Sequence, residues 1–227
     1  MAKTKFIKNW NKTTHVHFKK NWELAKYAFL GNTINTLSLY LDIFFLNHLV
    51  KNPEEIGFYG FALTLISGLR IVTSTAQQFV TPYYSEFSSN DKQILKAFKK
   101  SNKIFCLTII AVGVLAVFVA PIVIHYLFLG KYDNSMFYFQ VLTLSWAIRS
   151  WVSLKGPFLL AIGYVNVAFQ IALIVLLITV IPYWYLVKFY QIQGALYGQV
   201  FVAIVFFIVV NISFKNVVNK VYKIQQD

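Results

Sequence analysis

Six stretches of mostly apolar residues divide this chain, and polar or turn-forming residues separate them. A helix needs about 20 residues to cross the hydrocarbon core of a bilayer, and each stretch comes near or exceeds that length. The predicted spans are Ala25 to Val50, Ile56 to Tyr83, Ile104 to Leu129, Met136 to Ser153, Val165 to Val187 and Ile192 to Phe214. The connections include Asn52-Pro53 and Ser88-Ser89-Asn90, which favour turns. The pattern predicts an all-α integral membrane protein, with a bundle of six transmembrane helices over residues 25–214.

The composition supports a membrane protein and argues against nucleic-acid binding. Hydrophobic residues make up 58% of the chain and charged residues 13%, whereas about a quarter of a soluble domain is charged. The net charge of +13 lies between long apolar runs and not on a soluble surface. The sequence has no phosphate-binding glycine loop and no metal-binding motif, and its one cysteine, Cys106, can form no intrachain disulfide. We therefore expect no cofactor and no metal.

The basic residues predict the orientation in the membrane. Of the 21 Lys and Arg residues, 16 fall in segments on one side of the predicted bundle and three on the other, with two inside spans. Cytoplasmic loops of membrane proteins carry the excess of Lys and Arg, so both termini are predicted to be cytoplasmic. Residues 1–24 form a basic segment whose Trp10, Phe18 and Trp22 lie near helical spacing, as in an interfacial helix. Residues 215–227 form a basic cytoplasmic tail.

Polar residues recur every three or four positions on the first, second and fourth spans, which places them on one face of each helix. Lipid cannot satisfy such groups, so the stripes must face partner helices or a water-filled cavity. Small hydroxyl side chains could simply hold helices together, but charged ones need a further explanation. The third and fifth spans are apolar nearly all round and are predicted to face lipid. The candidate residues of a substrate cavity are Asn35, Asp42, Ser67, Arg70, Ser74, Gln77 and Arg149.

Arg70 is the strongest candidate because it lies about 14 residues from either end of its predicted span, roughly 20 Å along the helix. Its side chain is too short to reach either interface from there. A central arginine costs about 3 kcal/mol on insertion scales, and such residues usually mark a transport pathway. Arg149 lies at a similar depth, although a shorter span would bring it nearer the cytoplasm. Asp42 lies about 10 Å below the outer surface, as either a hydrated carboxylate or a cation-binding group.

After Asp42, the chain carries a series of local patterns: Pro53-Glu54-Glu55-Ile56-Gly57-Phe58-Tyr59, Phe79-Val80-Thr81-Pro82, Leu127-Phe128-Leu129-Gly130-Lys131-Tyr132, Leu160-Ala161-Ile162-Gly163 and Gly194-Ala195-Leu196. In this order, they resemble the C-terminal half of bacterial polysaccharide flippases, which belong to the superfamily of multidrug and lipid II exporters. The resemblance implies a transporter, not an enzyme, in the bacterial inner membrane. Its substrate would be a polyprenyl-pyrophosphate-linked oligosaccharide for capsule, O-antigen or exopolysaccharide assembly.

The sequence departs from this family in two respects. Ile43 stands where members often carry Arg or Lys, and a full member has about twice as many spans in two bundles. The resemblance thus implies one half of a two-bundle exporter, partnered by an N-terminal half or a second copy. The alternatives are a small-molecule or drug exporter of the same superfamily, a membrane-embedded transferase and an inactive remnant.

Overall fold

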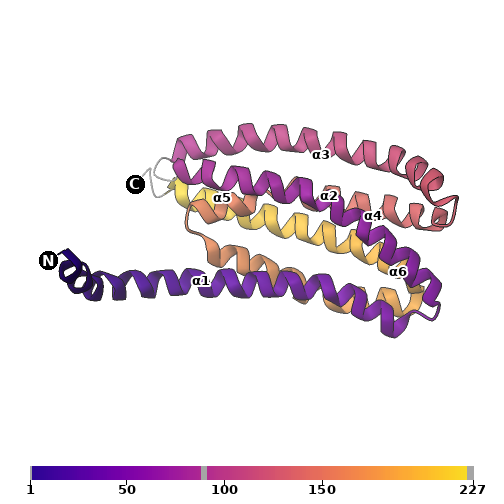
Figure 1. The fold of residues 1–227 in the computed structure, drawn as a ribbon, viewed down its shortest axis with the longest axis horizontal. Coiled ribbons are helices and arrows are strands. Elements are labelled where there is room, and N and C mark those ends of the chain that lie inside the picture. The colour runs from indigo at the N-terminus through magenta and orange to yellow at the C-terminus, as the bar shows by residue number, and fades with distance from the viewer. Residues whose placement is uncertain (1, 88–90, 224–227) are drawn as a thin grey trace.

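The computed structural model describes residues 2–87 and 91–223, which form helices and turns without a strand. The helices are α1 (Ala2–Leu49), α2 (Pro53–Glu86), α3 (Asp91–Phe128), α4 (Asp133–Trp151), α5 (Lys155–Ala161) and α6 (Val165–Lys223). They lie side by side as one elongated bundle (Figure 1). The expected connection at Ser88, Ser89 and Asn90 and the end of the expected tail, residues 224–227, lie outside the described residues.

Helix α6 folds back on itself at Gln191. This residue has φ 53° and ψ −131°, whereas the backbone on both sides is helical. Its two arms, residues 165–190 and 192–223, run in opposite directions along the bundle (Figure 1). The arms approach so closely at the reversal that a Cβ atom on Gly194 would overlap the carbonyl group of Leu186. A Cβ on Gly198 would come within 2.5 Å of the Tyr183 ring, so these two glycines permit the close packing.

The expectation of six separate membrane-crossing helices is not met. Among the described residues, four helices are long and apolar enough to cross a membrane: Ala25–Leu49, Pro53–Glu86, Gln93–Phe128 and Val165–Val221. The expected fourth span, α4, fails because its 19 residues include hydroxyl and amide side chains and Arg149. The expected fifth and sixth spans fall within the single helix α6. The chain is thus an all-α, multi-pass membrane protein with four clear candidate spans.

The beginnings and ends of the helices follow from local side-chain chemistry. Asn52 caps α2 by accepting a hydrogen bond from the Glu54 backbone N–H at 3.0 Å, and Pro53 occupies the first turn, where its missing N–H costs nothing. Helix α3 ends where Leu129 and Gly130 adopt positive φ, at 51° and 81°. No such break separates the expected N-terminal segment, residues 1–24, from the first span, since α1 is helical from Ala2.

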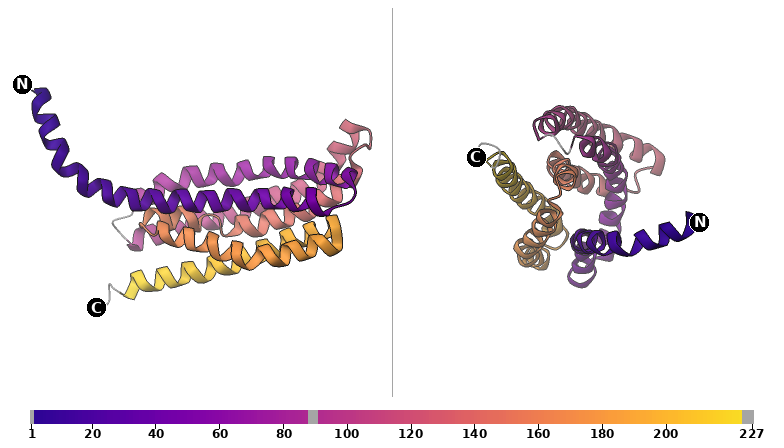
Figure 2. Two further views of the ribbon diagram at one scale, coloured as in Figure 1. Left: turned by 90° about the horizontal axis from the view of Figure 1, so that it is seen from below. Right: turned by 90° about the vertical axis from the view of Figure 1, so that its left-hand side faces the viewer.

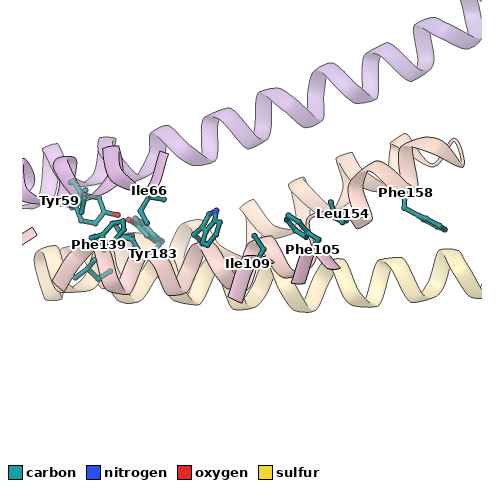
Figure 3. Close-up of a cluster of buried hydrophobic side chains, with 14 of the residues drawn as sticks. Tyr59, Ile66, Phe105, Ile109, Phe139, Leu154, Phe158 and Tyr183 are labelled. Carbon is teal, nitrogen blue, oxygen red and sulfur yellow. The ribbon is translucent and has the colours of Figure 1, made fainter. Parts of the chain in front are cut away.

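The packing places α1 against α6, and α2 against α4 and α5. A Cβ atom added to Gly31 of α1 would lie 3.6 Å from the Cα atom of Phe169, in the first arm of α6. Figure 2 shows the first turns of α1 curving away from the rest of the bundle. The buried core runs along the bundle, from Tyr59, Phe139 and Tyr183 near one end to Phe158 near the other (Figure 3).

The arrangement gathers the predicted cytoplasmic segments at one end. The start of α1, the start of α3, α5 and the end of α6 all lie there, and the turns before α2 and α4 lie at the opposite end (Figure 1). Lys51, Lys131 and Lys188 belong to that second end, which is predicted to be the outer one. The end of the bundle that gathers the predicted cytoplasmic segments therefore carries more basic residues than the opposite end.

Cysteine labelling of intact cells should confirm this orientation. In a Cys106→Ala background, an impermeant maleimide should modify Lys131→Cys, which is exposed in the turn before α4. It should spare Lys96→Cys, exposed near the start of α3, until the cells are opened. The opposite pattern would mean that the positive-inside assignment is wrong.

Candidate functional site: a polar cavity within the bundle

A cavity of about 430 Å³ lies between α1, α2, α4 and both arms of α6. Its volume falls within the range typical of small-molecule sites. No residue of α3 lines it, and large side chains of α3 such as Leu115 and Phe118 are exposed, in agreement with a lipid-facing helix. The cavity is therefore enclosed by the helices that carry the polar stripes, together with α6.

The structure brings six of the seven predicted cavity residues to this one cavity. They are Asn35 and Asp42 of α1, Arg70, Ser74 and Gln77 of α2, and Arg149 of α4. Ser67 does not line the cavity, and its Oγ donates a hydrogen bond to the Thr64 carbonyl oxygen on the exposed side of α2. Helical spacing placed Ser67 near the stripe, but the cavity meets only the central part of that face.

One end of the cavity contains a hydrogen-bonded network that connects four helical segments. Tyr59 of α2 donates a hydrogen bond from its hydroxyl group to Oδ2 of Asp42 in α1, at 2.7 Å. Arg149 of α4 donates from Nη2 to Oε1 of Gln199 in the second arm of α6, at 3.3 Å. The backbone carbonyl oxygen of Gln199 accepts a hydrogen bond from Ser145 Oγ at 2.9 Å, and the Gln199 side chain adjoins the Asp42 carboxyl group. We call this group of five residues the deep end of the cavity: Asp42, Tyr59, Ser145, Arg149 and Gln199.

The deep end is buried, whereas the rest of the cavity is more open. Asp42 is 4% exposed and Tyr59 is 1% exposed. Asp42 lies seven residues before the end of α1, or about 10 Å below the predicted outer surface. Asn35 and Ser74, which lie farther from that surface, are exposed. The cavity is thus closed toward the outer end of the bundle by the deep-end network and the core beneath it.

A second set of polar contacts joins α2 to α4. The hydroxyl groups of Thr73 and Ser150 are 3.0 Å apart, and Gln77 donates from Nε2 to the Ser153 carbonyl oxygen at 3.1 Å. These are the helix–helix contacts that small polar residues make in membranes. Helix–helix contact therefore accounts for at least part of the presence of Thr73 and Gln77 on this face of α2.

Arg70 differs from these residues because it forms no hydrogen bond or ion pair with any described residue. It lies near the midpoint of α2, lines the cavity and is attracted electrostatically by Asp42 without direct pairing. Within the described residues, the one ion pair within 4.0 Å joins His125 to Asp133 in the outer turn. The Arg70 guanidinium group is thus available to a ligand in the cavity.

The first arm of α6 supplies an apolar wall to the cavity. Ala172, Val175 and Leu176 line it, opposite the polar residues of α2 and α4. The prediction that this span faces lipid did not include this second role, because one side of the arm lines the cavity while Leu177 and Ile181 are exposed. Sequence cannot separate the two environments, because an apolar cavity wall and a lipid-facing surface select the same residues.

The predicted cavity residues also lacked three members of the deep end, Tyr59, Ser145 and Gln199. Gln199 is a polar amide within an otherwise apolar span, which is a usable signal of a buried contact. Tyr59 carried no comparable signal, because tyrosines are also frequent at membrane interfaces. Its partner Asp42 was identified, but the pairing depends on how α1 and α2 are placed relative to each other.

An aqueous thiol reagent should distinguish the cavity from the outside of α2. In a Cys106→Ala background in proteoliposomes, Ser74→Cys should react several-fold faster than Ser67→Cys. These are two serines of one helix that differ in whether they line the cavity. Ile109→Cys, at a position with no exposed surface in α3, is the unreactive control. A rate at Ser74→Cys as low as that at Ile109→Cys would show that water does not enter the cavity.

The fold and site define a class: a multi-pass membrane protein with a partly open cavity between its helices, which has a polar wall and an apolar wall. Comparison with protein families makes this more specific. Residues 4–137 match the model of a family described as "Polysaccharide biosynthesis protein", and since they make up more than half of the chain, the chain belongs to that family. No curated protein and no solved structure matches the chain. The matched region contains Asp42, Tyr59 and Arg70, whereas Arg149 and Gln199 lie beyond it.

Proposed function

We propose that this chain flips a lipid-linked oligosaccharide across the bacterial inner membrane for cell-surface polysaccharide assembly, as one half of a two-bundle transporter. The observation that supports this most directly is the cavity. It has a polar wall with two arginines and an apolar wall from α6, in a protein of the polysaccharide biosynthesis family. A lipid-linked oligosaccharide has the same mixed character, with hydroxyl groups, a charged diphosphate and an apolar chain. Arg70 is suited to the diphosphate, because a guanidinium group can bind two phosphate oxygens at once.

The proposal includes six membrane crossings, with α4 and the two arms of α6 crossing as well as α1, α2 and α3. Each arm of α6 is longer than the about 20 residues that a bilayer requires. The described ends of the chain lie at the same end of the bundle, as an even number of crossings requires (Figure 1). Arg149 and the hydroxyl groups of α4 face the cavity and neighbouring helices, which makes a polar span tolerable in lipid.

A second bundle would also explain an exposed face of α2 that is unusual for a lipid-facing surface. Gly57, Gly60, Thr64, Ser67 and Gly68 are small residues on α2, and no atom lies within 4 Å of a Cβ added to any of the three glycines. Small residues allow two membrane helices to approach closely. In parallel repeats, two bundles share one orientation, so a bundle with both ends inside can pair without inverting. The partner would be an N-terminal half-transporter or, alternatively, a second copy.

The alternative functions fit the site less well. A membrane-embedded transferase would need a polar catalytic cluster near one interface, whereas the polar residues here gather in the middle of the spans and toward the outer end. A drug exporter could use the same cavity, but the family favours a glycan substrate.

Reconstitution with a fluorescent lipid-linked oligosaccharide would test the proposal. Vesicles containing this chain alone should flip the lipid negligibly, and vesicles that also contain a complementary N-terminal bundle should flip it. Rapid flipping by a monomeric preparation would contradict the half-transporter interpretation. Failure of both preparations to bind or flip the lipid would contradict the flippase function itself.

A further inference from the structure

Buried polar atoms without a hydrogen-bond partner are concentrated in residues that line the cavity. Among the described residues, seven buried side-chain nitrogen or oxygen atoms have no partner, and five of the seven belong to cavity-lining residues. These atoms are Asp42 Oδ1, Trp146 Nε1, Arg149 Nε, Ser153 Oγ and Tyr183 Oη. Nearly all buried polar groups in proteins are hydrogen-bonded, because an unpaired one costs free energy. Their concentration in one place indicates that the cavity is built to hold a polar group.

The chemical types of these atoms narrow the class of ligand. Asp42 Oδ1 can accept a hydrogen bond, Trp146 Nε1 and Arg149 Nε can only donate one, and the Tyr183 hydroxyl group can do either. A phosphate group only accepts hydrogen bonds and would be repelled by Asp42. A sugar hydroxyl group both donates and accepts, so several hydroxyl groups on one ring can satisfy the whole set. A mixed set of this kind around a cavity fits a polyhydroxylated ring.

Three of these residues are more deeply buried than Arg70, whereas Arg149 lies close enough to Arg70 for the two positive charges to interact. Asp42, Trp146 and Tyr183 are 4%, 5% and 5% exposed, and Asp42 belongs to the closed, deep end. Arg70 is exposed and lies at the midpoint of α2, farther from the outer surface than Asp42. A ligand that occupies both regions would therefore place its neutral, hydroxyl-bearing part deep and its anionic part at Arg70.

We propose that Asp42, Trp146 and Tyr183 bind a sugar ring through its hydroxyl groups, while Arg70, with Arg149 nearby, holds the diphosphate. The substrate would thus enter sugar first, with the sugar toward the outer end of the bundle. This inference rests on the proposed function and adds to it the orientation of the substrate and the residues that contact the sugar.

Equilibrium binding to the full chain in nanodiscs would test it. The probes are undecaprenyl pyrophosphate and the same lipid carrying one hexose: glucose, galactose, N-acetylglucosamine or N-acetylgalactosamine. At least one hexose form should bind about three- to tenfold more tightly than the bare lipid, the range expected for one or two net hydrogen bonds. Tyr183→Phe should remove much of this gain, because it deletes only the hydroxyl group that lacks a partner and keeps the ring. Trp146→Phe should act in the same direction.

Two variants serve as controls. Tyr84→Phe removes the hydroxyl group of another buried tyrosine, one bonded to Ser101 outside the cavity, and should leave the gain unchanged. Arg70→Ala should weaken the binding of bare and glycosylated lipids by the same factor. Arg70-dependent binding of the bare lipid with no gain for any hexose would overturn the sugar site and leave the proposed function standing. A gain that persists in Tyr183→Phe and Trp146→Phe would also overturn the site, whereas failure of all probes to bind, both to this chain alone and in the presence of the complementary N-terminal bundle, would overturn the proposed function as well.

Discussion

Replacing Arg70 with alanine should abolish flipping of a lipid-linked oligosaccharide while leaving the amount of membrane-inserted protein unchanged or higher. Arg70 lies mid-membrane in the proposed topology, and removing a central arginine saves about 3 kcal/mol on insertion scales. It makes no hydrogen bond or ion pair with the described residues, so its removal leaves no buried partner unpaired. The loss of activity would therefore reflect a lost ligand contact and not a lost fold.

Arg70→Lys should recover little of this activity. A lysine keeps the positive charge but presents a compact ammonium group, which cannot bind two phosphate oxygens in the planar geometry of a guanidinium group. Flipping rates in vesicles with the complementary bundle, normalised to inserted protein, would measure both variants. Thr108→Ala removes the hydroxyl group of an exposed residue of α3 outside the cavity, and this control should flip the lipid normally. Full activity of Arg70→Ala would reduce Arg70 to a structural residue.

Replacing Gly194 with alanine should prevent α6 from folding back, and little folded protein should be recovered. The new Cβ would overlap the Leu186 carbonyl group, which is backbone and cannot rotate aside as a side chain could. Relief requires the two arms to separate, and overpacking even of adaptable cores costs about 1–3 kcal/mol. Separation would also move Gln199 away from Arg149 and Ser145, so the deep end would be lost together with the reversal.

Gly60→Ala and Gly68→Ala are matched controls for Gly194→Ala. Both glycines are exposed within α2, and a Cβ at either position meets no atom within 4 Å. Because alanine favours a helix over glycine by about 1 kcal/mol, these variants of the isolated chain should be as stable as the original or more so. Thermal unfolding in detergent, followed by size-exclusion fluorescence, would compare all three. A Gly194→Ala protein that unfolds at the original temperature would contradict the close packing of the arms.

The sequence was informative wherever a single helix carries the information. Apolar length located the helices, and the spacing of Asn35, Asp42, Arg70 and Ser74 identified the face that lines the cavity. It was less informative where two helices meet. Whether Ser67 lines the cavity depends on how far the cavity extends around α2. The pairing of Tyr59 with Asp42 depends on how α1 and α2 are aligned.

The count of spans shows the same limit in another form. Apolar length alone predicted one span on each side of residue 191. The described structure instead contains a single helix that is broken by one residue there. A reversal that uses one residue has none of the Gly, Pro or Asn clusters by which turns are usually recognised. It depends instead on Gly194 and Gly198, which lie inside the second arm and are informative only once the first arm is placed against them.

Two of the three turns at the predicted outer end, the turn before α4 and the reversal at Gln191, differ in how much change in length they can absorb. The turn before α4 is open, and Leu129 there is 93% exposed. The reversal at Gln191 has no spare residue, and the Gln191 side chain also accepts a hydrogen bond from the Lys51 backbone N–H at 3.0 Å. Over evolution, insertions and deletions should accumulate in the turn before α4 and be absent from the reversal at Gln191. An epitope tag should likewise be tolerated after Leu129 and not next to Gln191.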